Sequence, residues 1–312
     1  MNKKTITIVS PCYNEQEIIA EFYKRVSAVI STCTNYNFEF LFIDNASTDG
    51  TLGILKGLAS IDPRLKIIVN VRNFGHIRSP YWGVIQSSGH ATIYLASDLQ
   101  DPPELIPEFI EAWEQGFKVA WGIKPVSETH GITHTIRRLY YKFLDMVSDV
   151  PHVRDATGFG IYDKVVLDKI REINDPYPYF RGIISELGYE VKQIPFIQAR
   201  RLAGISKNNF YSLYDTAMLG IISHSLVPIR IASFLGFFLG IASILVALIF
   251  LVLKISYWDN FPVGYAPIMI AIFFMFGLLM CFIGLLGEYI GSIHTYLQKR
   301  PIVVEKERIN FD

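Results

Sequence analysis

Short apolar runs, rich in β-branched and aromatic residues, alternate with longer mixed stretches in the N-terminal part of the chain. This pattern predicts strands separated by helices, because strands favour these residue types and helices place apolar residues on one face. The predicted strands are Thr5–Ser10, Phe38–Ile43, Leu65–Val71, Ala91–Ala96 and Phe117–Trp121. The predicted helices lie near Glu15–Thr32, Thr51–Ser60, His76–Ser88 and Pro103–Gln115.

The alternation of strands and helices predicts an α/β fold with a mostly parallel, Rossmann-like sheet covered by helices. The predicted strands are largely apolar, which fits burial on both faces. Ligands of such sheets bind beyond the carboxyl ends of the strands. The polar residues that directly follow the strands are therefore the first candidates for function.

Two long apolar runs follow, Ile231–Leu253 and Ile268–Gly287, each without a charged side chain. As helices they would measure ~34 Å and ~30 Å, enough to cross the hydrocarbon core of a bilayer. Pro262, Gly264 and Pro267 interrupt the short link between them. We therefore expect a transmembrane hairpin; buried core helices are the less favoured reading of two such runs.

The pattern divides the chain into four parts. Residues 1–207 form a water-soluble α/β domain, and residues 208–229 form an interfacial helix or linker. Residues 230–291 hold the two transmembrane helices, at about 231–253 and 268–290, and residues 292–312 form a tail.

Composition supports this division. The formal net charge is zero, with 51% hydrophobic and 19% charged residues, which excludes a disordered chain and gives no sign of nucleic-acid binding. The segment 231–287 holds only Lys254 and Asp259, whereas the other 255 residues hold 56 of the 58 charged side chains. The average thus describes a soluble domain joined to a membrane domain.

The basic residues predict the orientation of the hairpin. Only Lys254 lies on the connecting side, and five basic residues flank the outer ends: Arg230, Lys299, Arg300, Lys306 and Arg308. The positive-inside rule therefore predicts a multi-pass protein of the plasma (inner) membrane, with the large domain and both termini in the cytoplasm.

Small residues recur four apart in the apolar runs, at Gly236 with Gly240 and at Gly287 with Gly291. Such pairs let helices approach closely. Packing within the hairpin and association into a homo-oligomer explain them equally well.

Polar motifs follow four of the predicted strands: PCYNE from Pro11, DNASTDG from Asp44, RNFG from Arg72 and SDLQD from Ser97. The chain lacks the GxGxxG and GxxxxGK[ST] motifs, which argues against a dinucleotide dehydrogenase and a P-loop ATPase. Carboxylates at these ends suit a nucleotide diphosphate held with Mg²⁺ or Mn²⁺. In an extended segment Asp98 and Gln100 would share one side. Helix capping is the alternative for Asp98 and Asp101, and a turn role for Asp44 and Asp49.

In this order, and together with RLAGISK and the two C-terminal apolar runs, these motifs resemble the family 2 glycosyltransferases. More narrowly, they resemble polyprenyl-phosphate glycosyltransferases, most of all the bactoprenol glucosyltransferases of O-antigen modification, and also the dolichyl-phosphate mannose synthases. The resemblance covers nearly the whole chain. It implies a GT-A catalytic domain over residues 1–207 and inverting sugar transfer from a nucleotide-sugar to a lipid phosphate.

The resemblance also implies roles for individual residues. Those matching the donor-binding segments are Pro11, Tyr13, Glu15, Asp44 and Arg72, and Asp44 is expected to hydrogen-bond the base. Asp98 and Gln100 match the metal-binding DxDxQ motif, but Ala96 stands where its first Asp would fall. One ligand is therefore missing, or replaced by water or Ser97. Arg201 and Lys207 match the basic segment that contacts the diphosphate and the acceptor phosphate.

Two further regions are candidates for acceptor chemistry. Asp155 matches the position of a base, although a lipid phosphate, with its second pKa of ~6, needs little deprotonation; orienting the acceptor and loop capping are the alternatives. Arg137 and Arg138 lie in a basic and aromatic stretch that we expect to bind the acceptor phosphate near the membrane, the alternative being a solvated helix face.

The favoured function is glucose transfer from UDP-glucose to polyprenyl (undecaprenyl) phosphate with Mg²⁺ or Mn²⁺. Other donors, such as GDP-mannose or a UDP-aminosugar, are the alternatives. The substitution at Ala96 also leaves open a degenerate, non-catalytic membrane partner.

Overall fold

The computed structural model describes residues 3–124, 156–173, 175, 178–197, 227–256, 265–298 and 300–311. An eight-stranded sheet with the order β7-β5-β6-β4-β1-β2-β3-β8 forms its centre. The strands are β1 Thr5–Cys12, β2 Asn37–Asp44, β3 Leu65–Asn70, β4 Ala91–Tyr94, β5 Val119–Ile123, β6 Ala156–Asp163, β7 Val191–Pro195 and β8 Glu305–Ile309. Only β6 and β8 run antiparallel to their neighbours, so the sheet is mostly parallel, as the sequence predicts.

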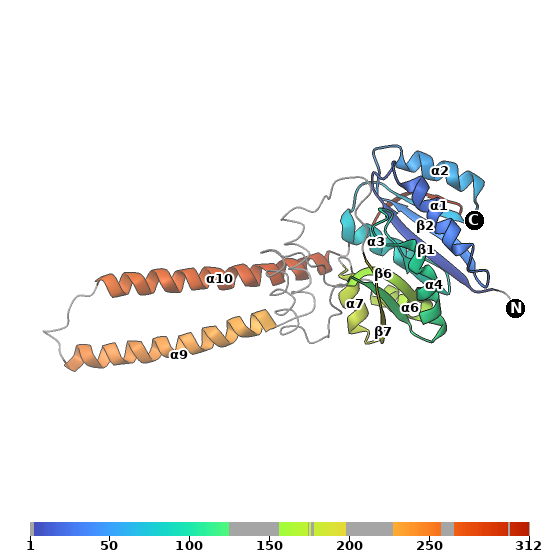
Figure 1. The fold of residues 1–312 in the computed structure, drawn as a ribbon. Helices are drawn as coiled ribbons and strands as arrows, with labels where there is room; N and C mark the ends of the chain where they lie inside the picture. Colours follow the sequence, from blue (N-terminus) through green and yellow to red (C-terminus); the bar gives the residue numbers. More distant parts are fainter. Residues whose placement is uncertain are drawn as a thin grey trace.

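Helices cover both faces of the sheet (Figure 1). One face is packed by α1 Ile19–Ile30, α2 Thr51–Ile61, η1 Pro103–Leu105 and α4 Ile106–Glu114; the other by α3 Gly75–Gln86, α6 Lys164–Ile173 and α7 Phe180–Glu186. In α1 the buried residues Ile19, Phe22, Val26 and Ile30 recur at helical spacing, which explains both its formation and its orientation. The expected strands and helices of the N-terminal part are thereby confirmed.

Close packing sets the position of α3. A Cβ built at Gly83 would lie 2.4 Å from Cγ1 of Ile43 and 2.9 Å from Cγ1 of Val9. No larger residue fits there without a shift, so glycine lets α3 lie directly on β1 and β2. The N-terminus of α3 is thus fixed close to the carboxyl ends of the strands.

The C-terminal segment belongs to the sheet, which the sequence pattern did not reveal. Strand β8 pairs with β3, and the N–H of Val71 donates to the carbonyl of Val304 (3.0 Å). Ile302 and Val303 are buried among the residues packed around α3. The part of residues 292–312 expected to be a tail therefore includes an edge strand of the α/β domain.

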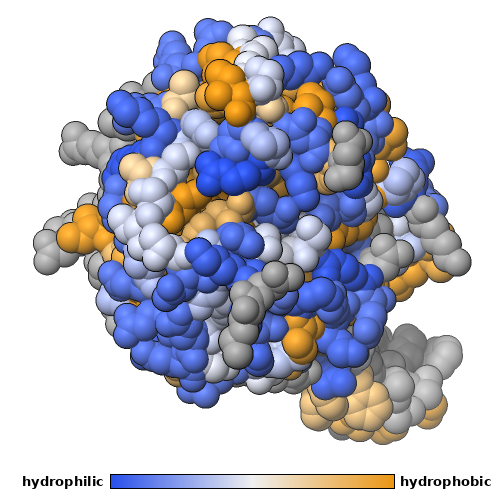
Figure 2. Space-filling view, turned by 90° about the vertical axis from the view of Figure 1, so that its right-hand side faces the viewer, coloured by the Kyte–Doolittle hydropathy of each residue, from blue (hydrophilic) through white to orange (hydrophobic). Residues whose placement is uncertain are grey.

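Helices α9 Val227–Ser256 and α10 Tyr265–Leu297 lie side by side and extend away from the sheet (Figure 1). Their large apolar side chains face outward: Phe234, Phe237 and Phe274 are 66%, 63% and 64% exposed. Among the described residues, one helical segment, Phe274–Leu297, is long enough and apolar enough to cross a membrane. Ile229–Leu239 is a shorter apolar stretch. By contrast, the end of the α/β domain opposite these helices is mainly hydrophilic (Figure 2).

Three glycines of the two pairs make no close contact with described atoms. No described atom lies within 4 Å of a Cβ built at Gly236, Gly287 or Gly291. Association between copies of the chain stays a prediction.

Candidate active site

The parallel register brings four polar segments to one edge of the sheet. Because β1 pairs with both β2 and β4, and β2 with β3, the segments after these strands lie next to one another. Pro11, Tyr13, Glu15 and Asp98 are partly buried at this edge, and Arg72 is exposed. The structure thus gathers the donor-binding and metal-binding candidates that it describes.

Left-handed backbone marks each of these strand ends. Asn14, Ala46 and Leu99 have φ angles of 56°, 60° and 56°, and Gly75 has 85°. Such conformations cost non-glycine residues roughly 1–3 kcal/mol and persist where the surroundings fix them. Leu99 is fixed by burial of its side chain in the core (1% exposed). Strained backbone is thus concentrated at the edge that carries the candidate residues.

Hydrogen bonds join the loop after β1 to the loop after β2. The amide N–H of Asn14 donates to Ser47 Oγ (3.0 Å), and its side-chain Oδ1 accepts the N–H of Thr48 (2.7 Å). The N–H of Glu15 donates to Thr51 Oγ1 (2.8 Å). These contacts hold the two loops as one unit before any ligand arrives.

Asp44 lies at the end of β2 and is fully buried. Its Oδ2 accepts the N–H of Ser47 (3.1 Å), which gives it a role in the turn. Burial raises the pKa of Asp44, the hydrogen bonds with Ser47 lower it, and the charge of Asp49 raises it. Its predicted bond to the base stays a prediction.

A buried amide network, which the sequence analysis did not single out, shapes the loop after β3. Asn45 Oδ1 accepts from Asn70 Nδ2 (3.0 Å) and from the N–H of Phe74 (2.9 Å). Asn45 Nδ2 donates to Asn73 Oδ1 (2.9 Å). This loop places the Arg72 guanidinium 4.0 Å from the centre of the Phe74 ring. Arg72 is thereby presented at the surface of the site.

Asp98, Gln100 and Asp101 follow β4. The N–H of Gln100 donates to Asp98 Oδ1 (3.2 Å). Ser97, considered as a substitute metal ligand, is buried and donates its hydroxyl to the Pro11 carbonyl (2.9 Å). Capping by Asp101 is not found, since η1 begins without a side-chain cap and Asp101 Oδ1 is buried without a hydrogen-bond partner.

These residues fit a cation that takes its other ligands from a substrate. Among the described residues no group of three or more His, Cys, Asp or Glu side chains could hold a metal alone. Mg²⁺, however, is commonly held by one or two carboxylates together with substrate phosphates and water. Asp101 Oδ1 is buried without a hydrogen-bond partner, and the charge of Asp98 raises the pKa of Asp101, so negative charge is gathered at this edge.

Comparison with known proteins decides the family. Residues 7–171, just over half of the chain, match the model of glycosyl transferase family 2. The chain belongs to this family. It is therefore a glycosyltransferase, and its α/β domain has the GT-A fold.

Similar glycosyltransferases match over almost the full chain. A bactoprenol glucosyl transferase of Shigella phage SfII is 32% identical, over 97% of this chain and 97% of its own. The uncharacterized glycosyltransferase YkcC of Bacillus subtilis is also 32% identical, over 96% and 92%. Among solved structures, the mannosyltransferase PcManGT from Pyrobaculum calidifontis, in complex with GDP-Man and Mn²⁺, is 14% identical with a TM-score of 0.48, covering 73% of this chain and 65% of its own.

Five candidate residues of this glycosyltransferase lie outside the described residues: Arg137, Arg138, Asp155, Arg201 and Lys207. Their roles stay predictions.

Asp101 should make the stability of the glycosyltransferase depend on pH. Burial raises the pKa of Asp101 to about 6, Lys124 lowers it and Asp98 raises it. Because this value lies above the unfolded-state value of ~3.9, the folded protein binds more protons between pH 4 and pH 6. Its free energy of unfolding should therefore fall as the pH rises through this window, by roughly 2–3 kcal/mol.

The D101N variant cannot ionise, so in metal-free buffer it should melt several degrees above the wild type at pH 7.5 and lose most of this advantage at pH 4.5. Melting curves at both pH values check this. The exposed carboxylate Glu108 provides the control, and E108Q should follow the wild type. Equal pH dependence in D101N and the wild type would contradict the assignment.

Proposed function

We propose that this glycosyltransferase moves a hexose, with inversion, from a nucleotide-sugar to a polyprenyl phosphate, and that UDP-glucose is the favoured donor. The observation that carries the proposal is the full-length similarity to bactoprenol glucosyl transferases, at 32% identity. The set of polar strand ends around Asp98 supports it, because a nucleoside diphosphate needs a polar edge of this kind.

Donor binding falls to the strand-end residues. In this proposal the donor contacts come from Pro11, Tyr13, Glu15, Asp44 and Arg72. The cross-linked loops after β1 and β2 support it, since a fixed loop loses little freedom when a nucleoside packs on it. Asp98 and Gln100 would hold Mg²⁺ or Mn²⁺, which supplies positive charge beside the departing diphosphate.

The acceptor chemistry needs few groups. An acceptor phosphate oxygen bonds to the anomeric carbon while the bond from that carbon to the diphosphate breaks, and the nucleoside diphosphate leaves with the bonding electrons. The phosphate is already largely anionic at neutral pH, so no strong base is needed. We assign Arg201 and Lys207 to the phosphates, Arg137 and Arg138 to the acceptor, and Asp155 to orienting the acceptor or acting as a base.

The position of the hairpin fits a lipid acceptor. We propose that α9 and α10 both span the membrane, and that the catalytic domain and both termini lie in the cytoplasm. The pairing of β8 with β3 supports this, because the chain returns to the same sheet after α10. A hairpin with both ends on one side is the arrangement this return requires.

A labelling assay tests the proposal. Purified protein with polyprenyl phosphate, Mg²⁺ and a panel of radiolabelled nucleotide-sugars should give labelled lipid with UDP-glucose, and EDTA should abolish it. If only GDP-mannose or only a UDP-aminosugar gives labelled lipid, that nucleotide-sugar is the donor and not UDP-glucose. No label from any donor would favour a non-catalytic partner, which the loss of the first motif Asp at Ala96 would then explain.

A further inference from the structure

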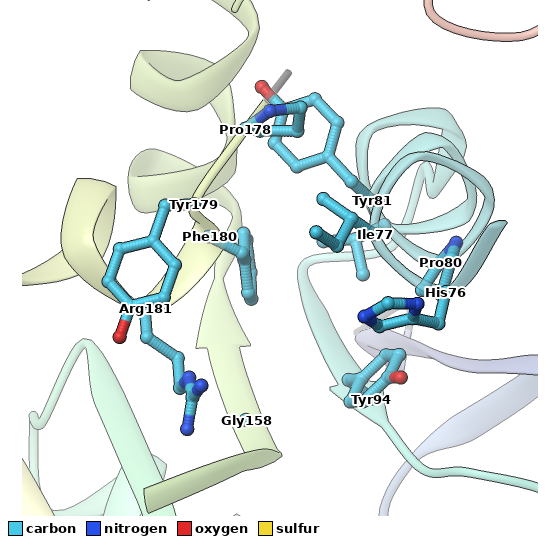
Figure 3. A pocket seen from close by; sticks show the side chains of 11 residues that line it. His76, Ile77, Pro80, Tyr81, Tyr94, Gly158, Pro178, Tyr179, Phe180 and Arg181 are labelled. Carbon is cyan, nitrogen blue, oxygen red and sulfur yellow. The ribbon is translucent and has the colours of Figure 1, made fainter. Parts of the chain in front are cut away.

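A pocket of about 230 Å³ opens between α3 and α7, and no motif pointed to it. Polar side chains line one part of it, from His76, Tyr94 and Arg181 (Figure 3). Ile77, Tyr81 and Pro178 line the opposite part. The pocket therefore has a cationic, hydrogen-bonding end and an apolar end.

The polar end adjoins the candidate active site. Burial raises the pKa of Tyr94, the charges of Asp101 and Asp98 raise it further, and the charge of Arg181 lowers it. Tyr94 also forms the end of β4, four residues before Asp98. Tyr94 is thus close both to Arg181 of the pocket and to the carboxylates after β4.

The apolar end lies toward the base of the hairpin. In α10, the Tyr296 hydroxyl donates to Asp175 Oδ2 (3.1 Å), three residues before Pro178 of the pocket. Ile302 and Val303, just after α10, pack in the same buried cluster as Tyr81. Figure 1 shows α3 and α7 on the side of the domain from which the hairpin extends. A lipid beside α10 would therefore meet the apolar end first.

We propose that this pocket receives the phosphate-bearing end of the prenyl acceptor, with Arg181 and His76 on the phosphate and Ile77 and Tyr81 on the first isoprene units. This inference rests on the proposed function and names the acceptor subsite of the same active site. The pocket is smaller than the ~300–1,000 Å³ that encloses whole small ligands, so it suits the end of a long chain. The guanidinium of Arg181 can hold two phosphate oxygens at once. The carboxylates of Asp98 and Asp101, which adjoin the polar end of the pocket, would repel a phosphate placed closer to them.

Direct binding tests the pocket without requiring turnover. Farnesyl phosphate is titrated into the purified full-length protein in detergent without donor, by calorimetry, and inorganic phosphate is titrated in parallel. R181Q removes a charge-assisted contact and should weaken farnesyl phosphate binding about 10- to 100-fold. R181K should lie between R181Q and the wild type. I77W should weaken farnesyl phosphate binding and leave inorganic phosphate unaffected.

Matched measurements separate the competing explanations. The control is R25Q. Arg25 pairs with Glu104 on the other face of the sheet, so this variant should bind the acceptor as the wild type does. Binding of the nucleotide donor should change less than twofold in R181Q. Equal losses for donor and acceptor would assign the pocket to the donor, and unchanged farnesyl phosphate binding in a folded R181Q would overturn the proposal.

The experiment distinguishes failure of the pocket assignment from failure of the proposed function. Arg181-dependent binding of farnesyl phosphate without sugar transfer from any donor would uphold the pocket and overturn the function. If R181Q and I77W transfer sugar as fast as the wild type, the proposed function is upheld and the pocket assignment is overturned.

Discussion

The D98N variant is expected to transfer sugar about 10²- to 10³-fold more slowly than the wild type. In the proposed match to the DxDxQ motif, Asp98 is the carboxylate that remains after β4, because Ala96 stands at the position of the first one. The Asn side chain keeps the shape of Asp98 and can still accept the Gln100 N–H, but it loses the negative charge that would hold a divalent cation. Initial rates with labelled UDP-glucose and polyprenyl phosphate measure the effect.

Metal affinity distinguishes this explanation from a folding defect. The binding of Mn²⁺ in the presence of nucleoside diphosphate, followed by electron paramagnetic resonance, should weaken in D98N. E108Q neutralises an exposed carboxylate on α4 and should leave both rate and Mn²⁺ affinity unchanged. Full activity in D98N would place the metal ligand elsewhere.

The double variant I302A/V303A is expected to lose roughly 3–6 kcal/mol of stability. Both side chains are almost fully buried, at 5% and 4% exposed, and they pack beside α3 just before β8. Since domains are typically stable by ~5–15 kcal/mol, this loss should leave much of the protein unfolded or aggregated after extraction. Size-exclusion chromatography and thermal unfolding of detergent-purified protein check the result.

A matched change on the same segment provides the control. Lys306 lies in β8 with its side chain exposed, so K306A should change stability by less than ~0.5 kcal/mol. If I302A/V303A has the same melting temperature as the wild type, the C-terminal segment contributes little to stability. That result would contradict the role inferred from the pairing of β8 with β3.

The sequence predicted the N-terminal strands and helices because their information is local. Strands buried on both faces, such as β2 with Phe40, Leu41 and Phe42, must be almost continuously apolar, and α1 must repeat its apolar residues at helical spacing. The polar strand ends were predictable for a related reason, since the parallel connection fixes which ends meet.

Other features depend on contacts between distant parts of the chain. Strand β6 inserts antiparallel between β4 and β5, and a short run with glycines gives no local sign of its neighbours. Strand β8 follows the hairpin in the sequence and pairs with β3, which precedes it. In addition, Lys56 of α2 donates to Glu307 of β8, 251 positions away. Its charged sequence, Glu-Lys-Glu-Arg-Ile, reads as a solvated tail because an edge strand is buried only in part.

The candidate site shows the same division. The sequence by itself determined the motifs, the family they resemble, and the carboxylates after β4, because these follow from residue type and spacing. Only the tertiary structure decided that Asp101 is buried and does not cap a helix. It also decided that Asn45 and Asn70 support the loop of Arg72. In the same way, it placed Arg181 and Tyr94 in one pocket. Burial and pairing of polar groups depend on which distant elements pack together, and no local pattern of residues records that.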